Sequence, residues 1–447
     1  MNLISSNKYT VVIGLGVTGL SVVRYLLAQG VRVVACDSRE NPPNLALVKQ
    51  LFPELSIQLG PLEVELLCSA HEIIISPGLS RKEAVIKQAI DTGISVVGDV
   101  ELFARAVKAP VVAITGSNGK TTVTTLVGEM AKAAGLNVVV AGNIGLPVLD
   151  TLNDAVDLYV LELSSFQLES TQSLKPVVAT VLNVSADHMD RYDSFMEYAL
   201  TKQRIAFGAK TIVVNKQDPL TEPPFADGVK RICFGAAQAD LKDFGLYGGD
   251  LMKGFKPLIA LADLKLVGLH NYTNAAAALA LAEAANIPMG ACLKALVEFR
   301  GLPHRCEFVT TIDGIDFIND SKATNVGATV AALKGFVGNV KNIHIILGGD
   351  GKGADFSPLV PALENLAKTV ILMGKDAPQL EALIAQALPE ITIINERSLE
   401  QAVVSAYKEA TAGDCVLLSP ACASLDMFSS FEQRGDVFSQ AAKGLLA

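Results

Sequence analysis

The chain has 447 residues, of which half are hydrophobic and 19% are charged, and its formal net charge is −9. That length corresponds to roughly three domains, and the negative charge argues against a general binder of nucleic acids or membrane surfaces, because both depend on basic fields. No apolar run approaches the ~18 residues that a membrane-spanning helix needs, and the first ten residues lack the layout of a signal peptide. Seven scattered cysteines without a CxxC pair indicate buried thiols in a reducing compartment. We therefore expect a cytoplasmic protein.

Short β-branched runs alternate with longer Ala- and Leu-rich stretches, which is typical of α/β layering. Strands are predicted at 10–13, 31–36, 73–75 and 94–97, then at 111–114, 138–141, 158–161, 178–182 and 212–214, and finally at 317–319, 344–347, 370–372, 391–394 and 415–418. Residues 217–256 are rich in Gly, Pro and Asp and look irregular. We predict an α/β protein of three domains, 1–98, 99–301 and 302–447, each built on an open sheet.

The first glycine-rich turn, Gly14 to Gly19 (GLGVTG), joins a predicted strand to a helix, and Asp37 ends the next strand. This is the dinucleotide fingerprint of Rossmann-like domains. It is weak on its own, because such glycines also serve tight turning and close helix packing. A dinucleotide, another nucleotide-bearing ligand and a purely structural turn all remain open. Ser38 and Arg39 stand where a ribose or base is read, and Ser76-Pro77-Gly78 ends another strand at the same crevice.

The strongest local signal is the loop Thr115 to Thr122 (TGSNGKTT), which follows an apolar strand and leads into a helix. Such a loop aims free backbone amides and the positive end of the helix at phosphate oxygens. Lys120 is then placed to reach the β- and γ-phosphates, and the Thr121 hydroxyl to ligate Mg²⁺. The loop is a shortened variant of the usual pattern, because position 114 is Ile. The alternative is a glycine turn with an incidental lysine, but strand, loop, Lys-Thr and helix occur in the required order. We therefore predict a phosphate site and a central ATPase domain of the P-loop type.

Other polar residues follow neighbouring strands of the predicted central sheet. Glu162 ends one strand and is well placed to hold the Mg²⁺ of the loop; the alternative is a solvated acid at the end of the strand. Asn143, Ser164 and Gln167 add neutral hydrogen-bonding groups at the same edge. His188 follows the strand at 178–182, where an isolated histidine is more often structural than a ligand.

Lys202 lies on a helix predicted at about 194–207, for which Ser194 and Glu197 form a capping box. On a helical wheel it shares its face with Phe195, Tyr198, Ala199, Ile205 and Ala206, opposite Glu197, Thr201 and Arg204. The side chain either snorkels to water or is buried, and burial lowers the pKa of an amine. A neutral amine reacts with CO₂ to give an anionic carbamate, which is a metal ligand.

Further candidates lie downstream. His270 to Asn274 precede an Ala-rich helix, where polar groups meet a base or phosphate, although capping explains Thr273 and Asn274 equally well. Arg305 offers a fixed fork for phosphate, and Asp320 is suited to ribose hydroxyls. Three residues after strands of the third unit, with nearby backbone amides, suit a small dicarboxylate: Thr324, Lys352 and Ser424.

Taken together, the sequence resembles the Mur ligases of bacterial cell-wall synthesis. The motifs that carry the resemblance are, in order, GLGVTG, TGSNGKTT, GNIG, ELSSFQLE, NVSADHMDRY, GLHNYTNAAAALALA, GLPHRCE, INDSKATN, GGDGKGADF and LSPACASLDMF. They span the whole chain, and the set in this order is specific. The resemblance implies a monomeric ligase that uses ATP and two Mg²⁺ ions to join D-glutamate to UDP-N-acetylmuramoyl-L-alanine through an acyl phosphate. It also implies a Rossmann-like fold for both terminal domains and assigns the first glycine turn to the UDP group rather than to NAD.

The resemblance further implies roles for individual residues. ATP would contact Gly116, Ser117, Asn118, Gly119, Lys120, Thr121, Thr122, Asn271, Arg305 and Asp320. One Mg²⁺ would bind Thr121 and Glu162, and the second would bind His188 and a carbamylated Lys202. The UDP substrate would contact Val17, Thr18, Asp37, Ser38, Arg39, Gly78, Asn143, Ser164 and Gln167, and D-glutamate would contact Thr324, Lys352, Ser424 and the backbone of Phe431. The implied catalytic set is Lys120, Asn143, Glu162, His188 and Lys202.

Three other functions compete with this interpretation. A nicotinamide-dependent oxidoreductase built on the first domain makes no use of the phosphate loop. A nucleotide-driven switch would use the loop without forming an amide. A related amide ligase, such as a folate polyglutamate ligase, is disfavoured by the N-terminal glycine turn and by the sequence between Gly301 and Met427.

Overall fold

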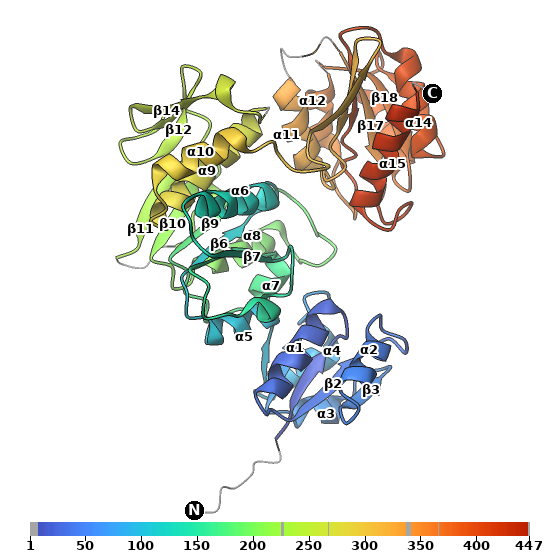
Figure 1. Cartoon of the computed structure of the whole chain (residues 1–447). Helices are drawn as coiled ribbons and strands as arrows, with labels where there is room; N and C mark the ends of the chain where they lie inside the picture. Colours follow the sequence, from blue (N-terminus) through green and yellow to red (C-terminus); the bar gives the residue numbers. More distant parts are fainter. Residues whose placement is uncertain are drawn as a thin grey trace, which may run out of the picture.

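The computed structural model describes residues 8–224, 228–266, 268–336, 340, 342–364 and 366–445. Three α/β units follow one another along the chain, and the central unit lies between the other two (Figure 1). Within the described residues, no helix combines the length and apolarity needed to span a membrane. The predicted fold class is confirmed, whereas the exact domain limits at 98 and 301 stay a prediction.

The N-terminal unit has a five-stranded parallel sheet in the order β3-β2-β1-β4-β5. Its strands are β1 (Thr10–Ile13), β2 (Val33–Asp37), β3 (Ser56–Leu59), β4 (Glu72–Ile75) and β5 (Ser95–Val97), and its helices are α1 (Val17–Ala28), α2 (Leu45–Leu51), α3 (Val64–Cys68) and α4 (Ala84–Asp91). The strand order reverses between β1 and β4, which makes the loops after these strands the expected ligand site of an open α/β sheet.

The glycine turn after β1 is required by packing. A Cβ at Gly19 on α1 would lie 1.7 Å from the carbonyl oxygen of Gly14. Any side chain there would push the helix away from the strand, so both positions need glycine whether or not a nucleotide is bound.

The central unit has nine strands in the order β14-β13-β12-β11-β10-β9-β6-β8-β7. They are β6 (Val111–Thr115), β7 (Val138–Gly142), β8 (Leu158–Glu162), β9 (Val178–Val181), β10 (Thr211–Asn215), β11 (Lys230–Phe234), β12 (Phe244–Tyr247), β13 (Asp250–Lys253) and β14 (Lys256–Ala260). The helices are α5 (Asp99–Ala106), α6 (Lys120–Ala133), α7 (Ser165–Glu169), α8 (Phe195–Gln203), α9 (Leu269–Ala284) and α10 (Met289–Glu298), with 3₁₀ turns η1 (Val148–Thr151), η2 (Arg204–Ala206), η3 (Pro219–Thr221) and η4 (Leu261–Asp263).

The stretch at 217–256 is only partly irregular, so the prediction is wrong where strands form; its residues 225–227 lie outside the described part of the chain. It contains β11, β12 and β13, and the antiparallel pairs β12–β13 and β13–β14 extend the sheet at one edge. These strands have only four or five residues and are joined by tight turns such as Gly248-Gly249, both with positive φ. Short strands between glycine turns leave no hydrophobic period long enough to recognise.

The C-terminal unit has a six-stranded sheet in the order β15-β16-β20-β17-β18-β19, in which only β15 is antiparallel. Its strands are β15 (Glu307–Ile312), β16 (Ile315–Asn319), β17 (Ile343–Gly348), β18 (Ala367–Met373), β19 (Thr392–Asn395) and β20 (Cys415–Leu418). Its helices are α11 (Val326–Phe336), α12 (Val360–Leu363), α13 (Ala377–Ala387), α14 (Leu399–Glu409) and α15 (Phe431–Gly444), with the 3₁₀ turn η5 (Ser357–Leu359). Figure 1 shows α11 on the side of this unit that faces the central unit, and α11 contacts α9.

Candidate active site

The loop after β6 presents the start of α6 to a pocket. Gly119 precedes the helix with φ of +82°, and a Cβ there would lie 2.6 Å from Oδ1 of Asn274 on α9. Glycine is therefore the residue that allows α9 and the loop to pack this closely. Because the first backbone amides of a helix have no intrahelical acceptor, the start of α6 is suited to bind an anion.

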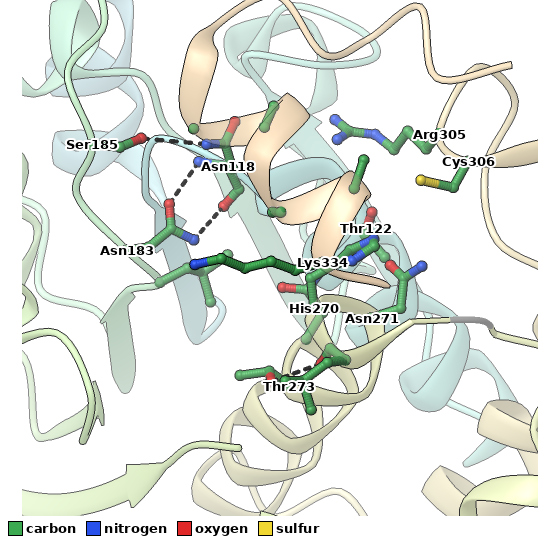
Figure 2. Close-up of a pocket in the computed structure, with 18 of the residues that line it drawn as sticks. Asn118, Thr122, Asn183, Ser185, His270, Asn271, Thr273, Arg305, Cys306 and Lys334 are labelled. Atoms are coloured by element: carbon green, nitrogen blue, oxygen red, sulfur yellow. Dashed lines mark hydrogen bonds between the residues drawn. The ribbon is translucent and has the colours of Figure 1, made fainter. Parts of the chain in front are cut away.

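Asn183, which follows β9, fixes the shape of this loop. Its Oδ1 accepts a hydrogen bond of 2.8 Å from the amide of Asn118, and its Nδ2 donates one of 2.9 Å to the carbonyl of Asn118 (Figure 2). Its own carbonyl accepts from the amide of Ser117 at 2.9 Å. The sequence analysis did not single out Asn183, although an asparagine just after a strand that neighbours the loop was a usable signal.

Two lysines, the buried Lys202 and the half-buried Lys120, meet at Gly116. Lys120 Nζ donates to the carbonyls of Gly116 and Ser117 at 2.8 and 2.9 Å, and Lys202 Nζ donates to the same Gly116 carbonyl at 3.0 Å. Burial lowers the pKa of Lys120, an effect that Glu162 and Asp187 oppose. Burial, followed by the charge of Lys120, holds the pKa of Lys202 well below its ordinary value. Lys120 is therefore the amine placed to meet a polyanion at the loop, whereas the lowered pKa of Lys202 favours its neutral form.

The helix that carries Lys202 differs in detail from the prediction. The α-helix ends at Gln203 and continues as η2, and Lys202 is 2% exposed, so it does not snorkel. Tyr198 shares the buried face, with its ring centroid 4.4 Å from Nζ. Phe195 was expected on that face but is exposed, whereas Thr201, expected on the opposite face, is buried.

The predicted capping box of this helix is only half formed. Ser194 Oγ accepts from the Glu197 amide, as expected, but the Glu197 carboxylate accepts from the amide of Asp193 instead of Ser194. Capping, one of the two explanations left open for Thr273 and Asn274, is wrong, because α9 already begins at Leu269 and both residues lie in its second turn.

Glu162 is the residue best suited to a cation. It ends β8, is 2% exposed, and its Oε1 accepts a hydrogen bond of 3.0 Å from Asn143 Nδ2. Its Oε2 is buried and has no hydrogen-bond partner among the described residues. A buried carboxylate oxygen without a partner is costly, and an oxygen-seeking ion such as Mg²⁺ would supply the missing partner.

His188 lies at the same edge of the sheet in a left-handed backbone conformation, with φ of 57°. Its ring packs edge-on against Phe166 at a centroid distance of 4.8 Å, and Nε2 lies 3.6 Å from Oδ2 of Asp187. Burial lowers the pKa of His188 although Asp187 opposes it, so the imidazole favours the neutral form that ligates metals. Within the described part of the chain, no three His, Cys, Asp or Glu side chains cluster as a metal site.

A pocket of about 470 Å³ opens beside the loop, between the central and C-terminal units. Figure 2 shows Asn118, Asn183 and Ser185 on one side of it and Arg305 and Cys306 on the other. Of the expected ATP-binding residues, Asn118, Gly119, Thr122, Asn271, Arg305 and Asp320 line it. Lining residues that were not predicted from the sequence include Asn215, Gln217, Phe234, Lys322 and Lys334. They come from the ends of β10 and β11, from loops and from α11, and only the fold reveals that these segments are neighbours.

Asp320 is buried in the wall of this pocket. Its carboxylate accepts hydrogen bonds from Ser419 Oγ at 2.8 Å and from the Cys306 amide at 3.2 Å. Burial raises the pKa of Asp320 to about 6, and these hydrogen bonds oppose the shift.

A second cavity of about 600 Å³ lies where the N-terminal unit meets the central unit. Eight of the nine residues expected at the UDP substrate line it: Val17, Thr18, Asp37, Ser38, Arg39, Gly78, Asn143 and Gln167. The ninth, Ser164, instead forms a capping box with Gln167 at the start of α7.

Asp37 holds Arg39 in the wall of this cavity. Its carboxylate accepts hydrogen bonds from the amide of Leu15 and from the backbone and guanidinium of Arg39. The hydrogen bond from Arg39 lowers the pKa of Asp37 to about 2. The Asp37 carboxylate therefore shapes the cavity by holding Arg39.

The residues expected at D-glutamate lie at the ends of C-terminal strands, near the central unit. Lys352 has a positive φ, and its Nζ reaches Oδ1 of Asp187 at 3.4 Å. Ser424 is buried next to Ala423, whose backbone pairs with that of Asp350. Thr324 precedes Asn325, whose amide exchanges two hydrogen bonds with that of Asn118, at 3.2 and 3.3 Å.

Phe431 completes this set at the start of α15. Its carbonyl oxygen accepts a hydrogen bond of 2.8 Å from Ser321 Oγ. The fully buried guanidinium of Arg434 binds Ser321 Oγ, the Ser321 carbonyl and the Cys422 carbonyl, and so joins the loops after β16 and β20.

Comparison with known families assigns all three units. The descriptions "Mur ligase MurD-like, N-terminal domain", "Mur ligase middle domain" and "Mur ligase, glutamate ligase domain" match residues 8–98, 114–282 and 304–422. The chain belongs to the Mur ligase family. Members of this family are ATP-dependent ligases, and they generally require Mg²⁺.

Relatives of this Mur ligase match it over its whole length. A UDP-N-acetylmuramoylalanine–D-glutamate ligase from Pseudomonas aeruginosa is 49% identical, and the match covers 100% of both chains. Among solved structures, a UDP-N-acetylmuramate–alanine ligase from Thermotoga maritima has a TM-score of 0.60 and 19% identity, covering 98% of this chain and 99% of that one. A pseudomurein peptide ligase type C from Methanothermus fervidus has a TM-score of 0.58 and 21% identity, covering 92% and 96%. The two structures support the three-domain fold of this Mur ligase.

Proposed function

We propose that this Mur ligase joins D-glutamate to UDP-N-acetylmuramoyl-L-alanine in an ATP-dependent reaction of cell-wall synthesis. The observation that carries the proposal lies at the phosphate loop. Lys120 and Lys202 share the carbonyl of Gly116, and Glu162, on the strand next to β6, has a buried oxygen with no hydrogen-bond partner among the described residues. The substrates are those in the name of the 49% identical relative, which this chain matches from end to end.

In the first proposed step, the alanyl carboxylate attacks the γ-phosphorus of ATP. A new O–P bond forms as the bond to the leaving ADP oxygen breaks, which gives an acyl phosphate and ADP. The amides at the start of α6, the ammonium of Lys120 and the guanidinium of Arg305 hold the phosphates, and Asp320 is available to the ribose hydroxyls. The protein acts here mainly by positioning and charge neutralisation, which is what phosphoryl transfer requires.

In the second step, the amine of D-glutamate attacks the acyl carbon. The tetrahedral intermediate collapses to the amide, phosphate leaves with the electron pair of the broken C–O bond, and the amine proton passes to that phosphate or to water. Lys352 would pair with a carboxylate of D-glutamate, while Thr324, Ser424 and the Phe431 backbone would offer hydrogen bonds. Their placement near Asp187 and Asn118 supports this assignment, because it puts the amino-acid side of the site next to the phosphate loop.

Two Mg²⁺ ions would complete the site. Thr121 and Glu162 would hold one ion and His188 with Lys202 the other, and the charge of the ions would neutralise the transferring phosphoryl group. For Lys202 we propose carbamylation, in which the neutral amine attacks CO₂, an N–C bond forms and one proton is released. Its burial and its lowered pKa support this chemistry, because both favour the neutral amine.

We further propose that the enzyme works as a monomer in the cytoplasm. All the proposed binding residues come from one chain, so a second copy is not needed to build the site. The reaction consumes ATP, and the cysteines of the described residues are all free thiols, as in a reducing compartment.

The proposal is tested by ADP release with candidate amino acids in the presence of UDP-N-acetylmuramoyl-L-alanine. We expect ADP and amide in equal amounts, with D-glutamate preferred over L-glutamate and other amino acids, and almost no turnover in Lys120→Ala. ADP release without amide would favour a nucleotide switch, and amide formation on a folate acceptor would favour the folate ligase. Binding of NAD(P)H, seen by its fluorescence, would favour the oxidoreductase.

A further inference from the structure

Arg191 of the central unit binds the N-terminal unit at the rim of the second cavity, which we call the UDP cavity because the residues expected at the UDP substrate line it. Its Nη1 donates to the carbonyl of Pro77 and its Nη2 to the carbonyl of Leu79, both at 2.9 Å. These carbonyls flank Gly78, and residues 76–79 form part of the cavity wall after β4. One guanidinium thus holds both carbonyls of this loop against the central unit.

Residues of the central unit also hold the side chain of Arg191 in place. Nη2 also donates to Oε2 of Glu169 at 3.0 Å, and the guanidinium carbon lies 3.9 Å from the ring centroid of Phe166. The side chain is only 13% exposed. Phe166 in turn packs against His188, and the backbone amide of Arg191 donates to the His188 carbonyl at 3.0 Å. Arg191 therefore connects the UDP cavity to the loop of the expected metal ligand His188.

Neighbouring cations reinforce this junction. Arg81 Nη1 donates to the Glu169 carbonyl at 2.8 Å, and Lys82 Nζ pairs with Asp193 and Glu197 at 2.9 Å. Arg81 and Lys82 belong to the loop after β4, so three cations join it to the central unit. Arg191 differs from the other two in that it donates directly to the carbonyls of the cavity wall.

The contacts at position 191 require an arginine, and a lysine cannot make all of them. The planar fork donates to two carbonyls and a carboxylate while its face stacks on an aromatic ring, and the point charge of a lysine cannot do both. A second contact between the same two units, Arg24 Nη1 to Asp150 Oδ1 at 2.9 Å, has an arginine that is 48% exposed. It lies away from the loop after β4 and provides a matched control.

We propose that Arg191 is a positioning residue for the nucleotide-linked acceptor. Through Pro77 and Leu79 it sets the cavity wall against the His188 loop, so that a substrate held by its UDP end presents its carboxylate at the phosphate loop. Arg191 itself does not touch the substrate. The inference deepens the proposed function and rests on it for the identity of the acceptor.

The kinetic test compares Arg191→Lys and Arg24→Ala with the wild type. Loss of charged hydrogen bonds predicts a KM for UDP-N-acetylmuramoyl-L-alanine that is roughly 10-fold higher in Arg191→Lys, with the KM for ATP unchanged within about twofold. Arg24→Ala should match the wild type in both. An unchanged acceptor KM in Arg191→Lys, or an equal loss of every kinetic constant, overturns the proposal.

A second measurement separates this inference from the proposed function. Hydrogen–deuterium exchange of the substrate-free protein reports on residues 76–79 and 188–191 without any reaction. We expect exchange there to be about 10-fold faster in Arg191→Lys than in the wild type and in Arg24→Ala, since the opening free energy falls with the lost hydrogen bonds. Unchanged exchange overturns the role of Arg191 even in an active ligase, whereas a wild type that forms no amide overturns the proposed function alone.

Discussion

Arg305 of the C-terminal unit donates a hydrogen bond of 2.8 Å from Nη2 to the hydroxyl of Thr121 on α6. The contact joins the residue that we expect at the ATP phosphates to the hydroxyl that we expect on Mg²⁺. Arg305 is half-buried at this position, and desolvation lowers the pKa of its guanidinium while Glu162 and Asp320 oppose the shift. The phosphate loop and the C-terminal unit are thus in contact at the point where the reaction would occur.

We predict that the activity of the enzyme depends on the hydroxyl group of Thr121 but not on its methyl group. Thr121→Val keeps the shape of the side chain and removes both the acceptor for Arg305 and the proposed Mg²⁺ ligand, so we expect kcat/KM for ATP to fall at least ~10-fold and the Mg²⁺ requirement to rise. Thr121→Ser should stay within a few-fold of the wild type. Magnesium titrations of the ADP-release rate measure this, and equal activity of the Val and Ser variants would contradict the assignment.

Gly119 offers a test with a matched control elsewhere in the chain. Gly119 and Gly135 both have φ of +82°, but a Cβ at Gly119 meets Asn274 at 2.6 Å, whereas one at Gly135 has no atom within 4 Å. Alanine carries a similar backbone penalty of about 1 kcal/mol at both sites, so only the collision differs. We expect Gly119→Ala to lose ATP binding in calorimetry and Gly135→Ala to retain it. Equal losses in the two variants would mean that backbone strain, rather than the fit against α9, is the cause.

If Lys202 is carbamylated, the activity of the enzyme should depend on CO₂. We predict that Lys202→Ala loses most activity, because the second metal loses a ligand, and that a small added carboxylic acid restores part of it. Wild-type enzyme depleted of CO₂ should lose activity and regain it with bicarbonate, and ¹³C-labelled bicarbonate should give a carbamate signal in NMR. Unchanged activity of Lys202→Ala would contradict the proposed carbamate.

Asp99 gives a prediction about pH and stability away from the proposed site. It begins α5, is 4% exposed, and its Oδ1 has no hydrogen-bond partner among the described residues. Burial raises the pKa of Asp99 from 3.8 to about 6 in the folded state. Between pH 4 and 6 the folded state therefore holds a proton that the unfolded state has lost, so this group reduces the free energy of unfolding as pH rises through that window.

Asp99→Asn removes the ionisation and with it this slope. Relative to the wild type, the variant should gain stability between pH 4 and pH 7, by at most about 3 kcal/mol at 1.36 kcal/mol per pKa unit. Urea unfolding at several pH values measures the difference, and Asp157→Asn at an exposed position serves as the control. A difference between Asp99→Asn and the wild type that stays constant with pH would contradict the prediction.

The sequence by itself determined the elements with a strong local pattern. Every predicted strand overlaps a strand of the structure, because buried parallel strands are continuous apolar runs. The loop at Gly116–Thr122 was also recognisable, since strand, glycines, Lys-Thr and helix are adjacent in the chain. Where the local pattern was weak the prediction failed, as for the short strands β11 to β13 and for the face of α8 that holds Thr201.

The contacts between segments that are far apart in the sequence could be seen in the tertiary structure alone. Arg191 lies 114 positions from Pro77, and Asn118 lies 207 from Asn325, yet each pair forms hydrogen bonds. Burial also depends on the tertiary structure: Lys202 is enclosed and does not snorkel, and one oxygen of Glu162 has no hydrogen-bond partner among the residues that the structure describes. The physical reason is that side-chain periodicity reports only on neighbours within a few residues, whereas desolvation and hydrogen bonding depend on every segment that packs around a group.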